Sequence, residues 1–148
     1  MKIIFIALTM TLLCLFLQAA FVGSCLRQYS RFRASHPGTV ARHENVMLLA
    51  IVMVLMMLSI IVQILLWGGL FYLLGEFEDY TTAAYHSGVN FTGLGYGDIV
   101  MSERWRPLGP LEAANGILMF GLSAAVMTAA IIEIIKFSQG GLPRDVDP

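Results

Sequence analysis

Long apolar runs separated by short polar segments are the main pattern of this chain. The runs are Ile3–Leu26, Val46–Leu74 and Leu111–Ile135. A helix needs about 20 predominantly apolar residues to cross a bilayer, and each run exceeds that length. The pattern therefore predicts transmembrane helices at residues 1–26, 46–75 and 111–137, with a basic linker at 27–45 and a short tail at 138–148.

The segment between the second and third runs is too polar and too rich in glycine to be a fourth span. Non-helical backbone is tolerated at membrane depth only where protein buries it or where it lines an aqueous cavity. We therefore expect this segment to be re-entrant. Asp79 is a suitable N-cap for a short helix at residues 80–91, because its side chain can accept a hydrogen bond from the first turn.

Residues 92–98 read Thr-Gly-Leu-Gly-Tyr-Gly-Asp and are called the glycine strip below. Glycine tolerates positive φ, so Gly93, Gly95 and Gly97 allow an extended backbone whose carbonyls turn to one side. Such carbonyls can replace the water around a cation. An ordinary glycine-rich turn is the alternative. A dinucleotide fingerprint is disfavoured because it requires Gly-x-Gly-x-x-Gly between a strand and a helix.

Composition places the chain in the membrane. Its 148 residues are 57% hydrophobic and 13% charged, with a mean hydropathy of +0.75, whereas soluble domains are roughly 25% charged. His36, His43 and His86 match no zinc-binding spacing, and no nucleophile, base and acid set is visible. We expect an all-α integral membrane protein that is not an enzyme, holds no cofactor and binds no nucleic acid.

Residues 46–136 resemble the two-transmembrane-helix pore domain of the potassium-channel superfamily, in the small prokaryotic type with an extra N-terminal membrane helix. Gly93–Asp98 matches the signature at five of six positions, with Leu94 counted for valine. The exception is Gly93, where the family has threonine. Gly116–Leu122 resembles the glycine-containing part of the inner helix, where such channels bend.

The resemblance implies a homotetramer among membrane lipids, with the re-entrant helix as pore helix and the glycine strip as selectivity filter. Potassium would bind the carbonyls of Gly93, Leu94, Gly95 and Tyr96, and Gly97 would complete the strip. The expected supporting residues are Thr92, Asp98, Tyr85 and His86, with either Tyr85 or His86 donating a hydrogen bond toward Asp98 or Tyr96. A hinge is expected at Gly116, the first choice, or at Gly121.

Two other functions remain open at this stage. Gly93 provides a carbonyl but no hydroxyl, so the innermost ion site would lose four ligands in a tetramer. A weakly selective cation channel is therefore one alternative to a potassium-selective channel. A non-conducting, channel-like accessory subunit or scaffold is the other.

Positive charge predicts the orientation in the cell (inner) membrane. The linker contains Arg27, Arg31, Arg33 and Arg42, and short arginine-rich loops stay in the cytoplasm. The N-terminus would then face outside, the glycine strip would enter from outside, and the C-terminus would be cytoplasmic. A signal peptide is the rival for the first run, but hydrophobic regions of signal peptides span roughly 7–15 residues.

Several side chains outside the strip carry secondary expectations. An acidic outer rim is expected from Glu76, Glu78 and Asp79, against the alternative of a merely solvated loop. Aromatic anchors at the interface are expected from Trp67, Tyr72 and Trp105, against ordinary packing. Glu133 is expected to pair with Lys136 or to form a ring at the inner mouth. Cys14 and Cys25 are expected to be inert packing thiols.

Overall fold

The computed structural model describes residues 1–35 and 42–139, which form four helices. They are α1 (Lys2–Ser35), α2 (Arg42–Leu73), α3 (Tyr80–Phe91) and α4 (Leu108–Gln139). Within these described residues there is no strand, so the all-α prediction is confirmed. The three long helices contain apolar spans at Lys2–Gln28, Asn45–Leu73 and Leu108–Ile135, which confirms the three predicted membrane-crossing segments by length and composition.

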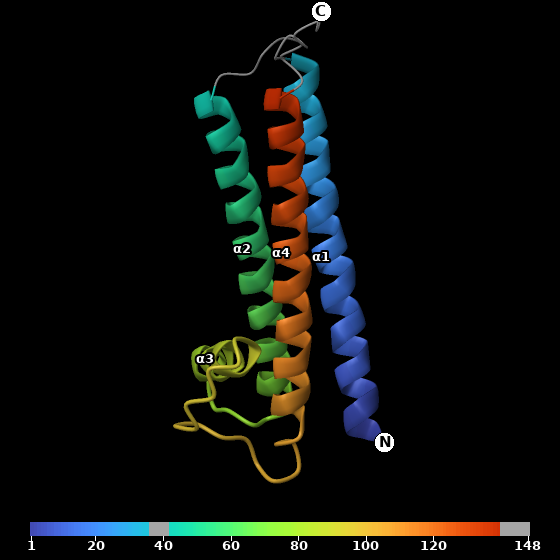
Figure 1. Ribbon diagram of the computed structural model, residues 1–148. Helices are drawn as coiled ribbons and strands as arrows, with labels where there is room; N and C mark the ends of the chain where they lie inside the picture. The colour runs from blue at the N-terminus through green and yellow to red at the C-terminus, as the bar shows by residue number, and fades with distance from the viewer. Residues whose placement is uncertain (36–41, 140–148) are drawn as a thin grey trace, which may run out of the picture.

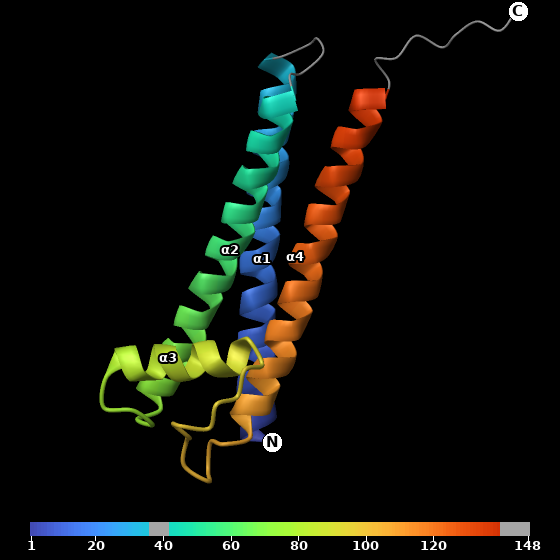
Figure 2. The same cartoon turned by 60° about the vertical axis from the view of Figure 1, so that its left-hand side comes forward.

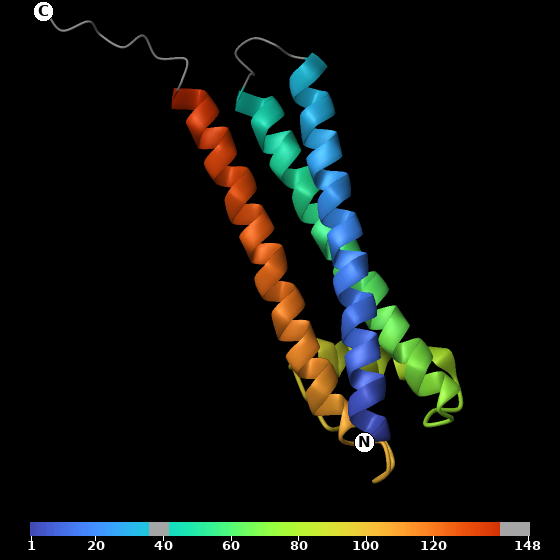
Figure 3. The same ribbon diagram turned by 90° about the vertical axis from the view of Figure 1, so that its right-hand side faces the viewer.

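The three long helices run side by side, and α3 lies across one end of them (Figure 1). Chain direction makes α1 and α4 parallel to each other and antiparallel to α2. Figure 2 shows that α4 leans away from α2 toward the end opposite α3. Figure 3 shows α1 close to α2 along much of its length, with the N-terminus at the end where α3 lies.

The helix ends differ from the hydrophobic boundaries. α1 continues beyond residue 26 to Ser35, and α2 begins at Arg42, so much of the predicted linker is helical. Arginine is a good helix former, and a change in hydropathy does not end a helix. α4 begins at Leu108 rather than at residue 111. Pro110 lies in its first turn, where the missing N–H has no intrahelical acceptor to bond.

α3 has the bounds and the cap that the sequence predicts. The backbone N–H of Thr82 donates to Asp79 Oδ1 at 2.8 Å, and the Thr82 hydroxyl donates to Asp79 Oδ2 at 2.6 Å. These bonds to the ionised carboxylate hold the pKa of Asp79 below its usual value. The N-cap therefore fixes where the short helix begins after the turn at Gly75.

The core near α3 is aromatic. Trp67 and Phe71 of α2 are fully buried, with ring centroids 5.9 Å apart. The interpretation of Trp67 as an interfacial anchor is therefore wrong, because α1, α3 and α4 enclose this part of α2. Tyr72 is 45% exposed, as an anchor requires. Trp105 is partly buried and carries the Arg104 guanidinium over its ring at 4.9 Å.

A buried polar network joins α1 to the other long helices. Gln18 is fully buried; its Nε2 donates to Ser123 Oγ of α4 at 2.9 Å. Its Oε1 accepts from Ser59 Oγ at 2.6 Å and from Gln63 Nε2 at 2.9 Å, both on α2. Hydrogen bonds between membrane helices contribute roughly 0.6–2 kcal/mol each. They attach α1 specifically to the two helices that flank α3.

Candidate functional site

The glycine strip leaves the C-terminus of α3 through a compact set of backbone hydrogen bonds. Thr92 is the C-cap of α3. Gly93 N–H donates to the carbonyl of Asn90 at 2.9 Å, and the N–H groups of Leu94 and Gly95 both donate to the carbonyl of Val89, at 3.0 and 3.2 Å. The strip therefore begins at the negative end of the α3 dipole, which favours a cation nearby.

The three strip glycines all have positive φ. The values are 72° at Gly93, 59° at Gly95 and 72° at Gly97. Residues with side chains rarely adopt this region, so the alternation of glycine with Leu94 and Tyr96 has a backbone cause. The positive φ of Gly93 agrees with the expectation from the sequence, although the family has threonine at this position.

The strip is on the surface of the single chain. All of residues 92–98 are exposed; Leu94 is 55% exposed and Tyr96 67%. A hollow of about 310 Å³ borders the glycines and is also lined by His86, Asn90 and Arg106. Two large apolar side chains on an irregular backbone therefore lack cover from their own chain.

Tyr85 anchors the C-terminal end of the strip. Its hydroxyl donates to Asp98 Oδ2 at 2.8 Å, which is one of the hydrogen bonds expected from the sequence. The bond to the carboxylate stabilises the neutral phenol and raises the pKa of Tyr85. Asp98 Oδ1 also accepts the N–H of Ile99 at 3.0 Å. Asp98 thus joins the strip to α3 and to the segment that follows.

His86 makes a different contact from the one expected. Its Nδ1 lies 3.0 Å from the carbonyl oxygen of Ile99, and its Nε2 lies 2.9 Å from Asn90 Nδ2. Because the amide nitrogen only donates, Nε2 accepts and Nδ1 carries the proton that is donated to Ile99. Burial between Phe71 and Phe77 lowers the pKa of His86. The neutral imidazole holds the segment after the strip against α3.

The two expected hinge glycines have different surroundings. A β-carbon on Gly116 would lie 1.9 Å from the carbonyl oxygen of Phe91, whereas a β-carbon on Gly121 would meet nothing within 4 Å. Gly116 therefore allows α4 to touch the last turn of α3. Gly68 has the same role between α2 and α3, because its β-carbon would lie 2.7 Å from Ala84 Cα.

Glu112 is a residue of this site that the sequence analysis did not select. It is fully buried on α4, and Ser87 of α3 donates to its Oε1 at 2.5 Å. The Ser87 hydroxyl is also 2.8 Å from the carbonyl oxygen of Ile64 on α2. The signal was present, because an acid inside an apolar run is a functional candidate.

Several buried polar atoms lie on α2 and α4. Glu112 Oε2, Trp67 Nε1, Gln63 Oε1 and both amide atoms of Asn115 have no hydrogen-bond partner among the described residues. The buried thiol of Cys14 on α1 faces Asn115 and Trp67. Cys14 therefore packs beside polar side chains rather than in a purely apolar layer.

In the acidic rim expected from Glu76, Glu78 and Asp79, two of the carboxylates accept hydrogen bonds within the chain. Ser102 donates its N–H to Glu76 Oε2 at 2.6 Å and its hydroxyl to Glu76 Oε1 at 2.8 Å. Asp79 is the cap of α3. Two of the three rim carboxylates therefore shape the loops around the strip. The Lys136 side chain and residues 140–148 lie outside the described part, so the Glu133–Lys136 pair is not described.

One family model matches the chain, and its description is "Ion channel". The match covers residues 59–133, about half of the chain, from the middle of α2 almost to the end of α4. The chain belongs to this ion-channel family. No match to a curated protein or to a solved structure accompanies it.

Membership in the ion-channel family confirms the resemblance to a two-helix pore domain. The matched segment contains α3, the glycine strip and the contacts of Tyr85, His86, Glu112 and Gly116. With three apolar helices, the ion channel is an integral membrane protein. α1 lies outside the matched segment, although Gln18 binds it to both flanking helices.

Proposed function

We propose that four copies of the chain form a potassium-selective channel whose axis is lined by carbonyls of Gly93, Leu94, Gly95 and Tyr96. The observation that carries this proposal is the strip itself. Its alternate residues have positive φ, its start is bonded to the end of α3, and Asp98 holds its C-terminal end. Backbone carbonyls arranged in rings select potassium without any charged ligand.

The exposed strip supports the assembly. One chain has one strip, so a ring of carbonyls requires several copies around an axis. Leu94 and Tyr96 are more than half exposed in the single chain, and neighbouring copies would cover them. The number four comes from the resemblance to tetrameric pores. Native mass measurement in mild detergent tests it, and a purely monomeric or dimeric protein would contradict it.

The proposed membrane placement follows from the arginines near the end opposite α3. With Arg27 and Arg31 at the cytoplasmic face, α3 and the strip would re-enter from the outer face. The N-terminus would lie outside. Labelling of cysteines introduced singly at Glu78 and at Gln28 with an impermeant thiol reagent, in a variant without Cys14 and Cys25, tests this placement. Only the cysteine at position 78 should react from outside intact cells.

Recording from purified protein in planar bilayers tests the function. A potassium-selective channel gives a reversal potential set by the potassium gradient when potassium and sodium face each other. The control is a variant in which Gly95→Ala places a side chain at φ 59°, where the strip needs glycine. Currents that survive unchanged in that variant would show that the strip is not the pathway. An assembled protein without current would favour the scaffold.

Gly93 supports a second candidate, a cation channel with weak selectivity. Glycine has no side-chain hydroxyl, so the innermost ion site has carbonyl ligands alone. Selectivity depends on the number and field strength of ligands. A reversal potential that barely moves when sodium replaces potassium would establish this candidate.

We further propose that α4 bends at Gly121 rather than at Gly116. The proposal rests on the open space around Gly121 and on the contact between Gly116 and Phe91. A bend at Gly116 would break the packing of α4 on α3. A bend at Gly121 leaves that packing in place.

A further inference from the structure

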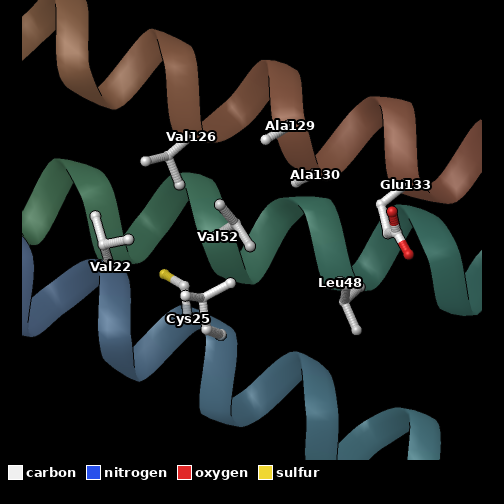
Figure 4. Close-up of a pocket in the computed structure, with 9 residues that line it drawn as sticks. Val22, Cys25, Leu48, Val52, Val126, Ala129, Ala130 and Glu133 are labelled. Atoms are coloured by element: carbon white, nitrogen blue, oxygen red, sulfur yellow. The ribbon is translucent and has the colours of Figure 1, made fainter.

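A second hollow lies far from the glycine strip, between α1, α2 and α4. Its volume is about 310 Å³, and its lining includes Val22, Cys25, Leu48, Val52, Val126 and Glu133. Figure 4 shows Cys25, Val52 and Val126 pointing into the same space from three different helices. The hollow lies toward the end of the bundle where α4 leans away from α2 (Figure 2).

The lining is apolar except at two points. Cys25 is 5% exposed and provides a thiol on the α1 side. Glu133 provides a carboxylate on α4 and lies toward one end of the hollow in Figure 4. Glu133 is exposed, so a bound group can reach its carboxylate. A ligand that fits this lining has a hydrocarbon part and a cationic group at one end.

The cationic side chain next to the lining in sequence is not itself a lining residue. Arg27 follows Leu26, which lines the hollow, and Arg27 is exposed with its guanidinium bonded to Ser24 Oγ at 3.2 Å. Glu133 is therefore the charged side chain among the lining residues. An ammonium on a lipid head group complements the carboxylate of Glu133.

We propose that the hollow binds one acyl chain of a phospholipid with a primary ammonium head group. The acyl chain would lie between Val52, Val126 and Cys25, and the ammonium would pair with Glu133. The assignment to the cytoplasmic leaflet rests on the orientation in the proposed function. The site itself does not depend on ion conduction.

The bound acyl chain would keep the half of α4 that follows Gly121 apart from α1 and α2. Val126 and Glu133 lie beyond Gly121 along α4, so this is the half that a bend at Gly121 would move. Filling and emptying of the hollow would therefore favour different positions of the inner helix. The lipid is thus a candidate regulator of opening.

Lipid retention tests the site without any measurement of current. Delipidated protein is incubated with vesicles of phosphatidylethanolamine, phosphatidylcholine or phosphatidylglycerol that share the same acyl chains, and bound lipid is counted by native mass measurement. We expect Val52→Trp, which fills the hollow, to reduce retained phosphatidylethanolamine about tenfold, equivalent to about 1.4 kcal/mol. The matched control is Val54→Trp, because Val54 is on the same helix, is 66% exposed and does not line the hollow.

Glu133→Gln tests the contact with the lipid head group separately from the contact with the acyl chain. We expect this variant to retain lipid but to lose about threefold of its preference for phosphatidylethanolamine over phosphatidylcholine, in keeping with one exposed ion pair. An unchanged preference would overturn the assignment of the ammonium to Glu133. Equal retention by Val52→Trp and Val54→Trp would overturn the site.

Cys25 gives an independent test that does not require a cavity-filling variant. In a Cys14→Ser background, a long-chain alkyl thiosulfonate should modify Cys25, and prior loading with phosphatidylethanolamine should slow this reaction about tenfold relative to delipidated protein. Equal reaction rates would overturn the proposal. Loss of current with normal lipid retention would contradict only the proposed channel function.

Discussion

The carbonyl oxygen of Phe91 lies 1.9 Å from the position that a β-carbon on Gly116 would occupy. Phe91 is the last residue of α3, and Gly116 lies in the third turn of α4. The contact fixes the helix before the strip against the proposed inner helix. A residue that the sequence predicts to be a hinge is therefore a point of close packing.

We predict that Gly116→Ala destabilises the protein by about 1–3 kcal/mol, because the methyl group forces α4 away from α3. The thermal midpoint should fall, and potassium selectivity should be disturbed with it. Gly121→Ala is the matched variant. It should raise the helix propensity of α4 by about 1 kcal/mol and lower the open probability without a change in selectivity. If single-channel records show instead that Gly116→Ala lowers the open probability without a change in selectivity, Gly116 is the hinge.

Much of the fold could be predicted from the sequence because it depends on local patterns. The three spans follow from hydropathy, and the start of α3 follows from Asp79, whose cap is made within its own first turn. The close approach of Gly68 to Ala84 and the burial of Trp67 could not be predicted in this way. Both depend on how α2 crosses α3, which no local pattern specifies.

The site was predictable to a similar degree. The glycine strip follows from a short motif. The resemblance to the family implied a hydrogen bond from Tyr85 or His86 toward Asp98 or Tyr96, and Tyr85 makes one to Asp98. The bond of His86 to Ile99 could not be distinguished in advance from one to Asp98, because these acceptors are adjacent in sequence. Glu112 and Ser87 are far apart along the chain, and only the packing of α3 on α4 brings them together.

A second prediction concerns Glu112. Glu112→Gln keeps an oxygen that can accept from Ser87, whereas Glu112→Leu leaves the buried Ser87 hydroxyl with the Ile64 carbonyl alone. We expect Glu112→Leu to cost about 1–3 kcal/mol of folding free energy and Glu112→Gln clearly less. Chemical unfolding in detergent measures both. If the losses from Ser87→Ala and Glu112→Leu simply add in the double variant, the bond between them is not the cause.

Tyr85→Phe should weaken the C-terminal end of the strip, because it removes only the hydroxyl that bonds Asp98. We expect currents that decline faster during sustained recording, most clearly at low external potassium, where fewer bound ions support the carbonyl rings. Tyr80→Phe is the control, since its hydroxyl bonds the Leu65 carbonyl away from the strip. Equal decline in the two variants would assign the effect to general loosening of α3.

His86 should make stability depend on pH. Burial lowers the pKa of His86, so the unfolded chain binds the proton more readily than the folded one. The contribution of His86 to the free energy of unfolding is therefore fully present above an ordinary histidine pKa of about 6.5. This contribution is lost as pH falls below that value. Thermal midpoints between pH 7.5 and pH 5 measure the loss. His86→Gln should flatten the part of the profile due to this residue, while His36 and His43 remain as the internal background.

Gly93 gives a prediction in which the need for a hydroxyl ligand and the need for a positive φ conflict at one residue. The resemblance would favour threonine for its hydroxyl, but φ at Gly93 is 72°, where a side chain costs about 1–3 kcal/mol. We expect both Gly93→Ala and Gly93→Thr to lower the yield of assembled, conducting protein, and Gly93→Thr the more so because threonine is β-branched.

Comparison of these two variants isolates the hydroxyl, since both introduce a β-carbon at the same strained φ. Among channels that still conduct, Gly93→Thr should have a higher permeability ratio of potassium to sodium than Gly93→Ala, because only threonine adds an oxygen ligand at the innermost site. Reversal potentials with potassium on one side and sodium on the other measure the ratio. Equal ratios would mean that the missing hydroxyl does not limit selectivity, and that glycine is present at this position for its backbone alone.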